Sequence, residues 1–279
     1  MSRLKIVGYA SGSPLSVLAM ARIARDHRLD GIVIPVRRRG VVQRLREIVR
    51  GPPLLANIAP LIPEAELEKI RPDVIVVASF PRIISMQTLR TARLGALNVH
   101  MSILPRHRGV DPIFWTYWND DSHAGVTIHW VSERIDAGDI VTQKSLPLVR
   151  GQASRETYHQ LSSCGVGLLS GALDGLATGQ MSRRPQEEGL ATYKSAADTT
   201  RARIPIDQWP AERVWHVLSG LGDQRNSLLE DANNRPIKHA RATCVRHFGS
   251  IEPGRIDCLG STYEIHCSDG IVVVERPDR

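Results

Sequence analysis

The chain has few of the residues that build metal sites and disulfide frameworks. Its 279 residues include four cysteines, and no two of them have the Cys-x-x-Cys spacing of zinc and redox motifs. We therefore expect free thiols in a reducing compartment rather than a metal site or a set of disulfides. The four cysteines are Cys164, Cys244, Cys258 and Cys267.

Long apolar segments are missing as well. No run of about 18 apolar residues is present, which argues against a membrane-spanning helix. The first residues lack the pattern of a secretory signal. A chain of this length can fold into one large domain and one small domain. We expect a cytoplasmic protein that does not insert into a membrane.

The glycine fingerprint of dinucleotide-binding proteins is incomplete, but the rest of the N-terminal half is typical of an α/β protein. Gly8 and Gly12 lie in GYASGSP, which does not complete Gly-x-Gly-x-x-Gly. Short apolar runs alternate with helical segments, and this alternation predicts parallel βαβ units in a Rossmann-like sheet. Ser13-Pro14 is typical of a helix start. The predicted strands are 4–9, 31–36, 73–79 and 96–100, and the predicted helices are 14–28, 64–70 and 154–177.

Two polar residues occupy one of the predicted strands. Asn98 and His100 are two positions apart, so both side chains point to the same face of an extended strand. The run ends at Pro105, which places both residues near the carboxyl end of the strand, where open parallel sheets bind ligands. An imidazole there can transfer protons near neutral pH, and an amide can donate to a developing oxyanion.

Asp136 is the third candidate. A carboxylate brought alongside the imidazole would orient it and favour its protonated form, and the set would suit attack of an amine on a carbonyl. Each residue alone also has an ordinary structural interpretation. A lone histidine is often hydrogen-bonded without catalysing anything, an isolated asparagine often lies at an edge, and an aspartate before Ala-Gly can open a turn.

Taken together, two segments resemble the folate-dependent formyltransferase family. They are LNVHMSILPRHRGVDPIFW and GVTIHWVSERIDAGDIV. The family pattern is Asn-x-His-x-Ser-Leu-Leu-Pro, a glycine-containing loop, a Gly-Val-Thr-type strand and Leu-Asp-x-Gly, and the resemblance spans residues 3–180. The matching residues are Asn98, His100, Ser102, Leu104, Pro105, Gly109, Gly125, Thr127, Asp136 and Gly138, with Ile103 and Ile135 in place of leucine.

The resemblance implies direct transfer of a formyl group from 10-formyltetrahydrofolate to an amine, without a metal or a covalent enzyme intermediate. It implies that Asn98 and protonated His100 hold the oxyanion, while Asp136 orients and charges His100. The expected folate contacts are Phe80, Pro81, Arg82, Ile83, Ile135, Ala137 and Gly138, and the expected acceptor contacts are Ser102, Arg106, Arg108, Gly109 and Trp115.

Two features near these residues have open interpretations. The aromatic cluster of Phe114, Trp115, Tyr117 and Trp118 either packs inward from a helix or forms a stacking wall for a base or sugar. His129 follows Thr127 on a predicted strand, and we interpret it as a structural residue.

The C-terminal part resembles the barrel-like, OB-related domain of methionyl-tRNA formyltransferases. Pro253-Gly254-Arg255-Ile256 and Ser268-Asp269-Gly270-Ile271 carry this likeness. We expect a catalytic domain at 1–182, a linker at 183–202 and a small β-rich OB-like domain at 203–279. Within the last, a helix is predicted from Pro210 to Leu218, and β segments at 237–247, 253–259, 261–267 and 270–275.

The net charge of the chain does not indicate whether the acceptor is a tRNA or a small molecule. The formal net charge is +7, and an arginine cluster lies where the tRNA-modifying enzymes of the family carry a basic insertion. The same arginines could bind the diphosphate of a nucleotide sugar or simply face solvent. They are Arg37, Arg38, Arg39, Arg44, Arg46 and Arg50.

Several segments around the motif depart from the tRNA-modifying branch, although the three catalytic candidates are intact. The usual Gly-Thr-Pro-x-Phe, Ala-Tyr-Gly, Arg-Gly-Ala-Ala-Pro-Ile-Gln and Asn-Pro-x-Pro-Gly segments are replaced by 10–14, 78–81, 108–115 and 220–225. We therefore expect a small-molecule amine acceptor, either a nucleotide-linked amino sugar or an amine of specialised metabolism. A divergent methionyl-tRNA formyltransferase is the alternative. A non-catalytic nucleic-acid-binding protein would leave the intact motif unexplained.

Overall fold

The computed structural model describes residues 3–35, 43, 45, 54–56, 64–222, 228–231, 235–237, 242–245 and 251–275. The chain forms two compact units whose segments alternate along the sequence. The first unit comprises Met1–Gly109, Ala124–Leu146 and Tyr158–Tyr193, and the second comprises Val110–His123, Pro147–Thr157 and Lys194–Arg279. The expected boundaries at 182 and 203 stay a prediction.

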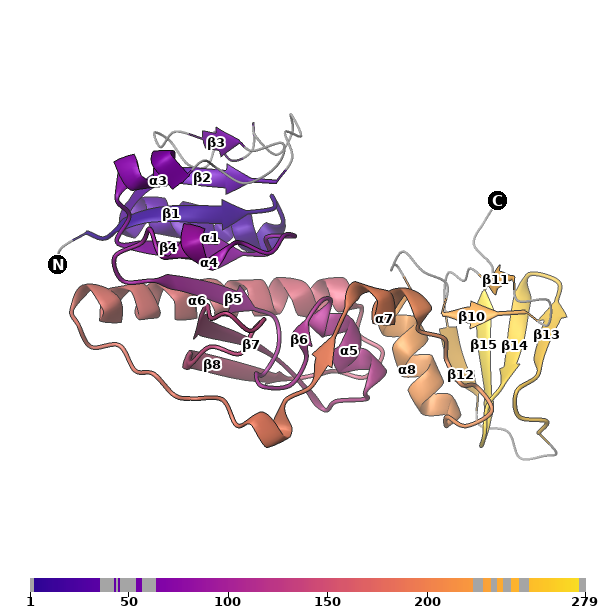
Figure 1. Ribbon diagram of the computed structural model, residues 1–279. Coiled ribbons are helices and arrows are strands. Elements are labelled where there is room, and N and C mark those ends of the chain that lie inside the picture. The colour runs from indigo at the N-terminus through magenta and orange to yellow at the C-terminus, as the bar shows by residue number, and fades with distance from the viewer. Residues whose placement is uncertain are drawn as a thin grey trace. The chain divides into compact units, whose positions relative to one another are not determined.

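The first unit is built on a seven-stranded sheet in the order β3-β2-β1-β4-β5-β7-β8 (Figure 1). The ladders from β3 to β5 are parallel, whereas β7 runs antiparallel to β5. Its strands are β1 (Lys5–Ala10), β2 (Arg28–Ile34), β3 (Leu54–Ala56), β4 (Val74–Ala78), β5 (Ala96–His100), β7 (His123–Trp130) and β8 (Ile140–Pro147), with short β6 (Arg108–Gly109) and β9 (Tyr193–Lys194) outside the sheet. The predicted Rossmann-like parallel arrangement is confirmed, with an antiparallel edge.

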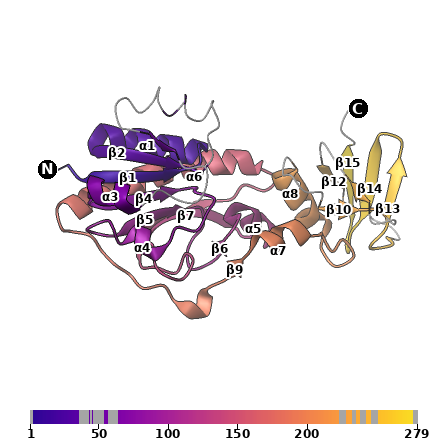
Figure 2. The same cartoon turned by 45° about the horizontal axis from the view of Figure 1, so that its top comes forward.

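Helices cover both faces of this sheet (Figure 2). The helices are α1 (Pro14–Asp26), α3 (Glu64–Ile70), α4 (Met86–Leu89) and α6 (Ser154–Ala177). A Cβ on Gly165 of α6 would lie 3.2 Å from Val99 and 3.7 Å from Leu15, so α1 and α6 cover the same face. On the other face, Leu67 of α3 and Leu89 of α4 join a buried apolar cluster with strand residues.

The start of α1 shows how local sequence sets this arrangement. Ser13 caps the helix, because its hydroxyl accepts a hydrogen bond from the Ser16 amide, and Pro14 occupies the first helical turn. Gly8 on β1 faces this helix, and a Cβ there would lie 2.0 Å from the sulfur of Met20. The absence of a side chain at Gly8 therefore lets α1 approach the sheet closely, which explains this glycine without a dinucleotide.

The second unit combines three helices with a four-stranded antiparallel sheet. The sheet order is β12-β15-β14-β13, and α8 is tied to it because Trp215 Nε1 donates to the Ala242 carbonyl at 3.0 Å. The elements are α5 (Pro112–Trp118), α7 (Ala196–Arg201), α8 (Ala211–Leu221), β10 (Leu229–Glu230), β11 (Pro236–Ile237), β12 (Ala242–Val245), β13 (Ile256–Leu259), β14 (Thr262–His266) and β15 (Ile271–Glu275). The small β-rich C-terminal region predicted from the sequence is confirmed.

Two findings concern the described cysteines and helices. Cys164, Cys258 and Cys267 are free thiols. Within the described residues, none of the helices combines the length and the apolar character that a bilayer crossing requires.

Candidate active site

The site lies on the face of β5 that is opposite α6. Asn98 and His100 point to this face, while the alternating residues Leu97 and Val99 are buried on the opposite face, where Val99 lies near α6. In the β5–β7 ladder, Asn98 pairs with His129 and His100 pairs with Thr127. The predicted placement of two polar side chains on one face is therefore confirmed, and the antiparallel neighbour adds a second row of polar groups beside them.

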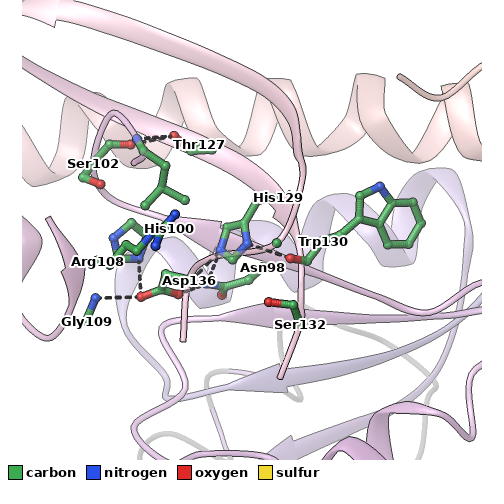
Figure 3. A network of polar contacts seen from close by, with 12 residues as sticks. Asn98, His100, Ser102, Arg108, Gly109, Thr127, His129, Trp130, Ser132 and Asp136 are labelled. Carbon is green, nitrogen blue, oxygen red and sulfur yellow. Dashed lines mark hydrogen bonds and ion pairs between the residues drawn. The ribbon is translucent and has the colours of Figure 1, made fainter. Parts of the chain in front are cut away.

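The carboxylate of Asp136 lies between these side chains and the loop that follows β5 (Figure 3). Its Oδ1 accepts from Asn98 Nδ2 at 3.3 Å, and its Oδ2 accepts from the Gly109 amide at 2.8 Å. The same Oδ2 lies 3.5 Å from His100 Nδ1. The structure thus brings together the three residues that the sequence pattern singled out.

His129 belongs to the same network, although its sequence context suggested only a structural role. Its Nδ1 lies 2.8 Å from the Trp130 carbonyl, which can only accept, so this nitrogen carries the proton. The other nitrogen, Nε2, is then free to accept from Asn98 Nδ2 at 3.0 Å. His129 therefore fixes the orientation of the Asn98 amide. The signal in the sequence was its spacing from Thr127, but only the register with Asn98 reveals the contact.

The electrostatics of the site favour an ionised Asp136. Burial raises the pKa of its carboxyl group, but the adjacent His100 and His129 imidazoles and the hydrogen bond from the Gly109 amide lower it by more. The net result is a pKa well below the usual range for aspartate.

Burial has the larger effect on His100. It lowers the pKa of the imidazole because the charged form loses its hydration, and the nearby His129 and His107 add to this effect. The Asp136 carboxylate and the His107 carbonyl, which accepts from His100 Nε2 at 2.8 Å, oppose it without reversing it. The net downward shift of this pKa favours the neutral imidazole, and the expected role of Asp136 in charging His100 stays a prediction.

The residues expected to contact the acceptor differ in burial and in their hydrogen-bond partners. Ser102 is buried and its hydroxyl donates to the Arg106 carbonyl at 2.7 Å. Arg108 is also buried, and its guanidinium donates to Gln186 and Glu188. Both side chains therefore hold the loop itself in this structure, and their contact with an acceptor stays a prediction. Arg106 is exposed, and the Gly109 amide is used by Asp136.

The expected folate contacts lie on two loops of the first unit. One follows β4, where Ser79 has a φ of 53° and Phe80 packs edge-on against Tyr9, with 5.1 Å between the ring centroids. The other carries Asp136 and connects β7 to β8. Each loop exposes a large apolar side chain, Ile83 at 77% and Ile135 at 42%.

The remaining expected folate contacts are distributed over the same two loops. Pro81 and Arg82 are exposed, and Ala137 is half-buried. Gly138 is buried, and a Cβ there would lie 1.8 Å from the Trp130 carbonyl oxygen. This glycine therefore serves the close approach of the loop to the end of β7.

Trp115 and its aromatic neighbours belong to the second unit. Trp115 and Tyr117 are buried. The ring of Phe114 stacks on that of Trp118 with 5.7 Å between centroids, and the centroids of Trp118 and Trp209 are 4.9 Å apart. This arrangement supports the interpretation as inward packing. The arginines between 37 and 50 lie outside the described residues.

Comparison with known proteins places this geometry in a family. A formyl transferase family model matches residues 63–173. A methionyl-tRNA formyltransferase of Syntrophus aciditrophicus is 42% identical over 212 residues, which cover 75% of this chain and 67% of that protein. The chain belongs to the folate-dependent formyltransferase family. A methionyl-tRNA formyltransferase of Moorella thermoacetica is 36% identical over 195 residues, and the match spans 68% of this chain but 62% of that relative's length.

Solved structures of the formyltransferase family share the fold over a longer stretch. The N-formyltransferase of Helicobacter canadensis, solved with folinic acid and dTDP-3-aminofucose, has a TM-score of 0.75. The two chains are 16% identical, and the match covers 99% of each. The similarity in fold therefore includes the C-terminal part of the chain, beyond the residues matched by the family model.

Proposed function

We propose that this member of the family transfers a formyl group directly to the amine of a small-molecule acceptor. The observation that carries the proposal is the convergence of Asn98, His100 and Asp136 on one face of the sheet. An amide donor, a buried neutral imidazole and an ionised carboxylate are the groups that acyl transfer to an amine requires.

The donor implied by the family is 10-formyltetrahydrofolate, which supplies the formyl carbon that the amine attacks. The residues present fit such a donor. The two loops at 80–83 and 135–138 expose Ile83 and, directly before Asp136 in the sequence, Ile135, and apolar side chains of this kind can contact a flat ring system. These loops are our proposed folate contacts.

Asn98 is the proposed oxyanion donor. Its Nδ2 donates to His129 Nε2 at 3.0 Å and to Asp136 Oδ1 at 3.3 Å, so the second hydrogen bond is the longer one. A negatively charged formyl oxygen would compete best for that second N–H. His129 meanwhile keeps the amide in place through the first, so that little reorganisation is needed during the reaction.

His100 and Asp136 are the proposed acceptors of the proton that the amine loses. The neutral imidazole can take this proton, and the resulting imidazolium faces the Asp136 carboxylate at 3.5 Å. As the new C–N bond forms, the bond between the formyl carbon and the donor nitrogen breaks. The proton held by the His100–Asp136 pair then returns, through water, to the departing nitrogen.

The proposed acceptor is an amino sugar linked to a nucleotide or another small amine. The departures from the tRNA-modifying pattern around the motif support it. The likeness in fold to the Helicobacter canadensis N-formyltransferase, which was solved with a nucleotide-linked amino sugar, supports it further.

A divergent methionyl-tRNA formyltransferase is the second candidate. It is supported by the curated relatives, which carry that name and are 36% to 42% identical to this chain. In both candidates the donor and the three catalytic residues are the same, and only the acceptor differs.

The test is to incubate the protein with 10-formyltetrahydrofolate and to follow the mass gain of one formyl group by mass spectrometry. One set of reactions contains nucleotide-linked amino sugars, and the other contains methionyl-tRNA. Formylation of an amino sugar supports the proposal, whereas formylation of methionyl-tRNA at physiological salt supports the second candidate.

The Asn98→Ala variant tests whether the assigned residues form the active site. Loss of an oxyanion donor slows catalysis by about 100- to 1,000-fold, and this variant should show such a loss in kcat while staying folded by circular dichroism. A folded Asn98→Ala protein with near wild-type turnover would contradict the assigned site.

A further inference from the structure

A segment that the sequence suggested was only a connecting loop contacts the active site. Residues 182–192, here called the strap, run along the edge of the first unit. At one end Arg184 exchanges backbone hydrogen bonds with Ile140 of β8, and at the other the Thr192 carbonyl accepts from the Arg108 amide at 2.8 Å. The strap therefore lies beside both loops that build the site.

Gln186 is the strap residue that joins these two loops. Its Nε2 donates to the carbonyls of Asp136 at 2.8 Å and Gly138 at 2.7 Å. Its Oε1 accepts from Arg108 Nε at 3.0 Å and from Arg108 Nη2 at 2.8 Å. Both amide hydrogens and both lone pairs of the oxygen are thus used, and among the other side chains only asparagine, which is shorter, offers the same groups.

The Asp136 loop needs such support. Asp136 has a φ of 51°, in the left-handed region that residues other than glycine rarely adopt. Its carboxylate faces His100 Nδ1 only because the loop is held in this conformation. Two hydrogen bonds to the carbonyls of Asp136 and Gly138 fix the backbone on either side of Ala137.

Charged neighbours fix Gln186 in turn. Arg108 is buried, and its Nη2 also donates to Glu188 Oε1 at 2.9 Å. Glu188 also accepts from Arg108 Nη1 at 3.2 Å and from Arg134 Nη2 at 2.6 Å. The strap, the loop after β5 and the loop after β7 therefore form one hydrogen-bonded assembly around the site.

We propose that Gln186 is a positioning residue that holds the Asp136 carboxylate against His100. This inference rests on the proposed formyl transfer for its kinetic consequence, but not for its structural one. Three titratable groups face His100: Asp136 from the loop after β7, His129 from β7 and His107 from the loop after β5. Of their side chains, that of Asp136 raises the pKa of His100 and the two imidazoles lower it, so loss of the carboxylate's position should lower that pKa.

Two variants separate the roles of Gln186. Gln186→Leu removes all of its hydrogen bonds, whereas Gln186→Glu keeps the shape and the pairing with Arg108 but cannot donate to the two carbonyls. Gln180→Leu is the matched control, because Gln180 lies on the exposed chain just before the strap. Folding of each variant is checked by circular dichroism and thermal unfolding.

The kinetic measurements are kcat, the KM of the acceptor and the dependence of kcat/KM on pH. A displacement of about 1 Å in an active site can cost about 100-fold in rate, so we expect kcat to fall by about 10- to 100-fold in both Gln186 variants. The KM should change much less, and the acid limb of the pH profile should move to lower pH. Gln180→Leu should match the wild type.

The second readout is independent of activity. The pKa of His100 is measured by NMR of ring-labelled histidine, with the signal assigned by its loss in His100→Gln. A lower His100 pKa in both Gln186 variants supports the inference. Wild-type kcat in a folded Gln186→Glu protein overturns it, as does a loss of activity that is equal at every pH with an unchanged His100 pKa. If the wild type transfers no formyl group, the proposed function fails, and the NMR titration alone decides whether Gln186 positions Asp136.

Discussion

Individual contacts fix the chemical state of each side chain in the site. The Trp130 carbonyl determines which nitrogen of His129 is protonated, and His129 in turn orients the Asn98 amide. The hydrogen bond from the Gly109 amide and the neighbouring imidazoles lower the pKa of the Asp136 carboxyl, and burial lowers the pKa of His100. The site therefore holds a base and a carboxylate in the states that proton transfer from an amine requires.

Because His129 orients the Asn98 amide, a substitution at His129 should lower turnover although His129 does not contact the reacting atoms. His129→Phe keeps an aromatic ring but removes the acceptor for the Asn98 amide, so the amide can rotate away from its position. We expect a kcat loss of about 10-fold, smaller than that of Asn98→Ala, since the amide itself remains. Steady-state kinetics on the folded variant checks this prediction. A loss as large as that of Asn98→Ala would show that His129 does more than orient the amide.

At the scale of elements, a loop of the site is held in place where its backbone approaches a neighbouring strand closely. The loop between β7 and β8 packs on the end of β7 so tightly that only glycine fits at position 138. The sequence pattern predicted Gly138 as part of a motif, but it could not reveal this contact, because the contact depends on how the loop folds back onto the Trp130 carbonyl.

Gly138→Ala should therefore disturb the site through the backbone. The added Cβ would lie 1.8 Å from the Trp130 carbonyl oxygen, so the loop and the adjacent Asp136 must move. We expect kcat to fall by about 100-fold, as for other small displacements of catalytic groups. Gly189→Ala is the control, because a Cβ there meets no atom within 4 Å. Equal activity of the two variants would mean that the loop tolerates the shift.

The helix α8 contains a further buried histidine, remote in sequence from Asn98 and His100. His216 stacks on Tyr117 at 5.0 Å, and its Nδ1 accepts from the Gly151 amide at 3.0 Å. Burial lowers the pKa of His216 to about 4. The unfolded chain, with a histidine pKa near 6.5, therefore binds a proton at a higher pH than the folded chain does.

This difference predicts acid sensitivity of the second unit. The stabilisation from neutral His216 is complete above pH 6.5 and is lost as the pH falls from 6.5 to about 4. A pKa difference of one unit corresponds to about 1.4 kcal/mol, so the unfolding free energy should fall measurably over this range. Chemical denaturation at several pH values checks the prediction. The slope should flatten in His216→Phe, and an unchanged slope would assign the effect to other groups.

At the scale of the whole molecule, the sequence predicted strands β1, β2, β4 and β5, helices α1, α3 and α6 and the Rossmann-like sheet, because their apolar spacing is local. It also predicted that Asn98, His100 and Asp136 form one site, because the motif and its spacing are visible in the sequence itself. It did not predict the roles of His129 and Gln186, because these depend on the register of β7 beside β5 and on the path of the strap. The structure also assigns Ser102 and Arg108 to the support of their own loop.

The net charge of +7 gives a prediction that separates the two acceptors. Binding of a polyanion releases counterions, so affinity for nucleic acid falls by about 1,000-fold or more between 50 and 200 mM salt when several phosphates are contacted. With a small acceptor that carries one diphosphate, we expect kcat/KM to fall by less than about 10-fold over this range. Initial rates at increasing potassium chloride concentration check this. A steep loss for a sugar nucleotide would indicate a large ionic contribution from the arginine cluster.

The alternation of side chains along β5 has a consequence for changes in chain length. Leu97 and Val99 are buried on the face where Val99 lies near α6, while Asn98 and His100 face the active site. Insertion or deletion of a single residue within this strand would exchange the two faces, sending the catalytic pair into an apolar interface and the apolar pair into the site. Variation in this strand should therefore be restricted to substitutions, whereas variation in length is compatible only with its flanking loops.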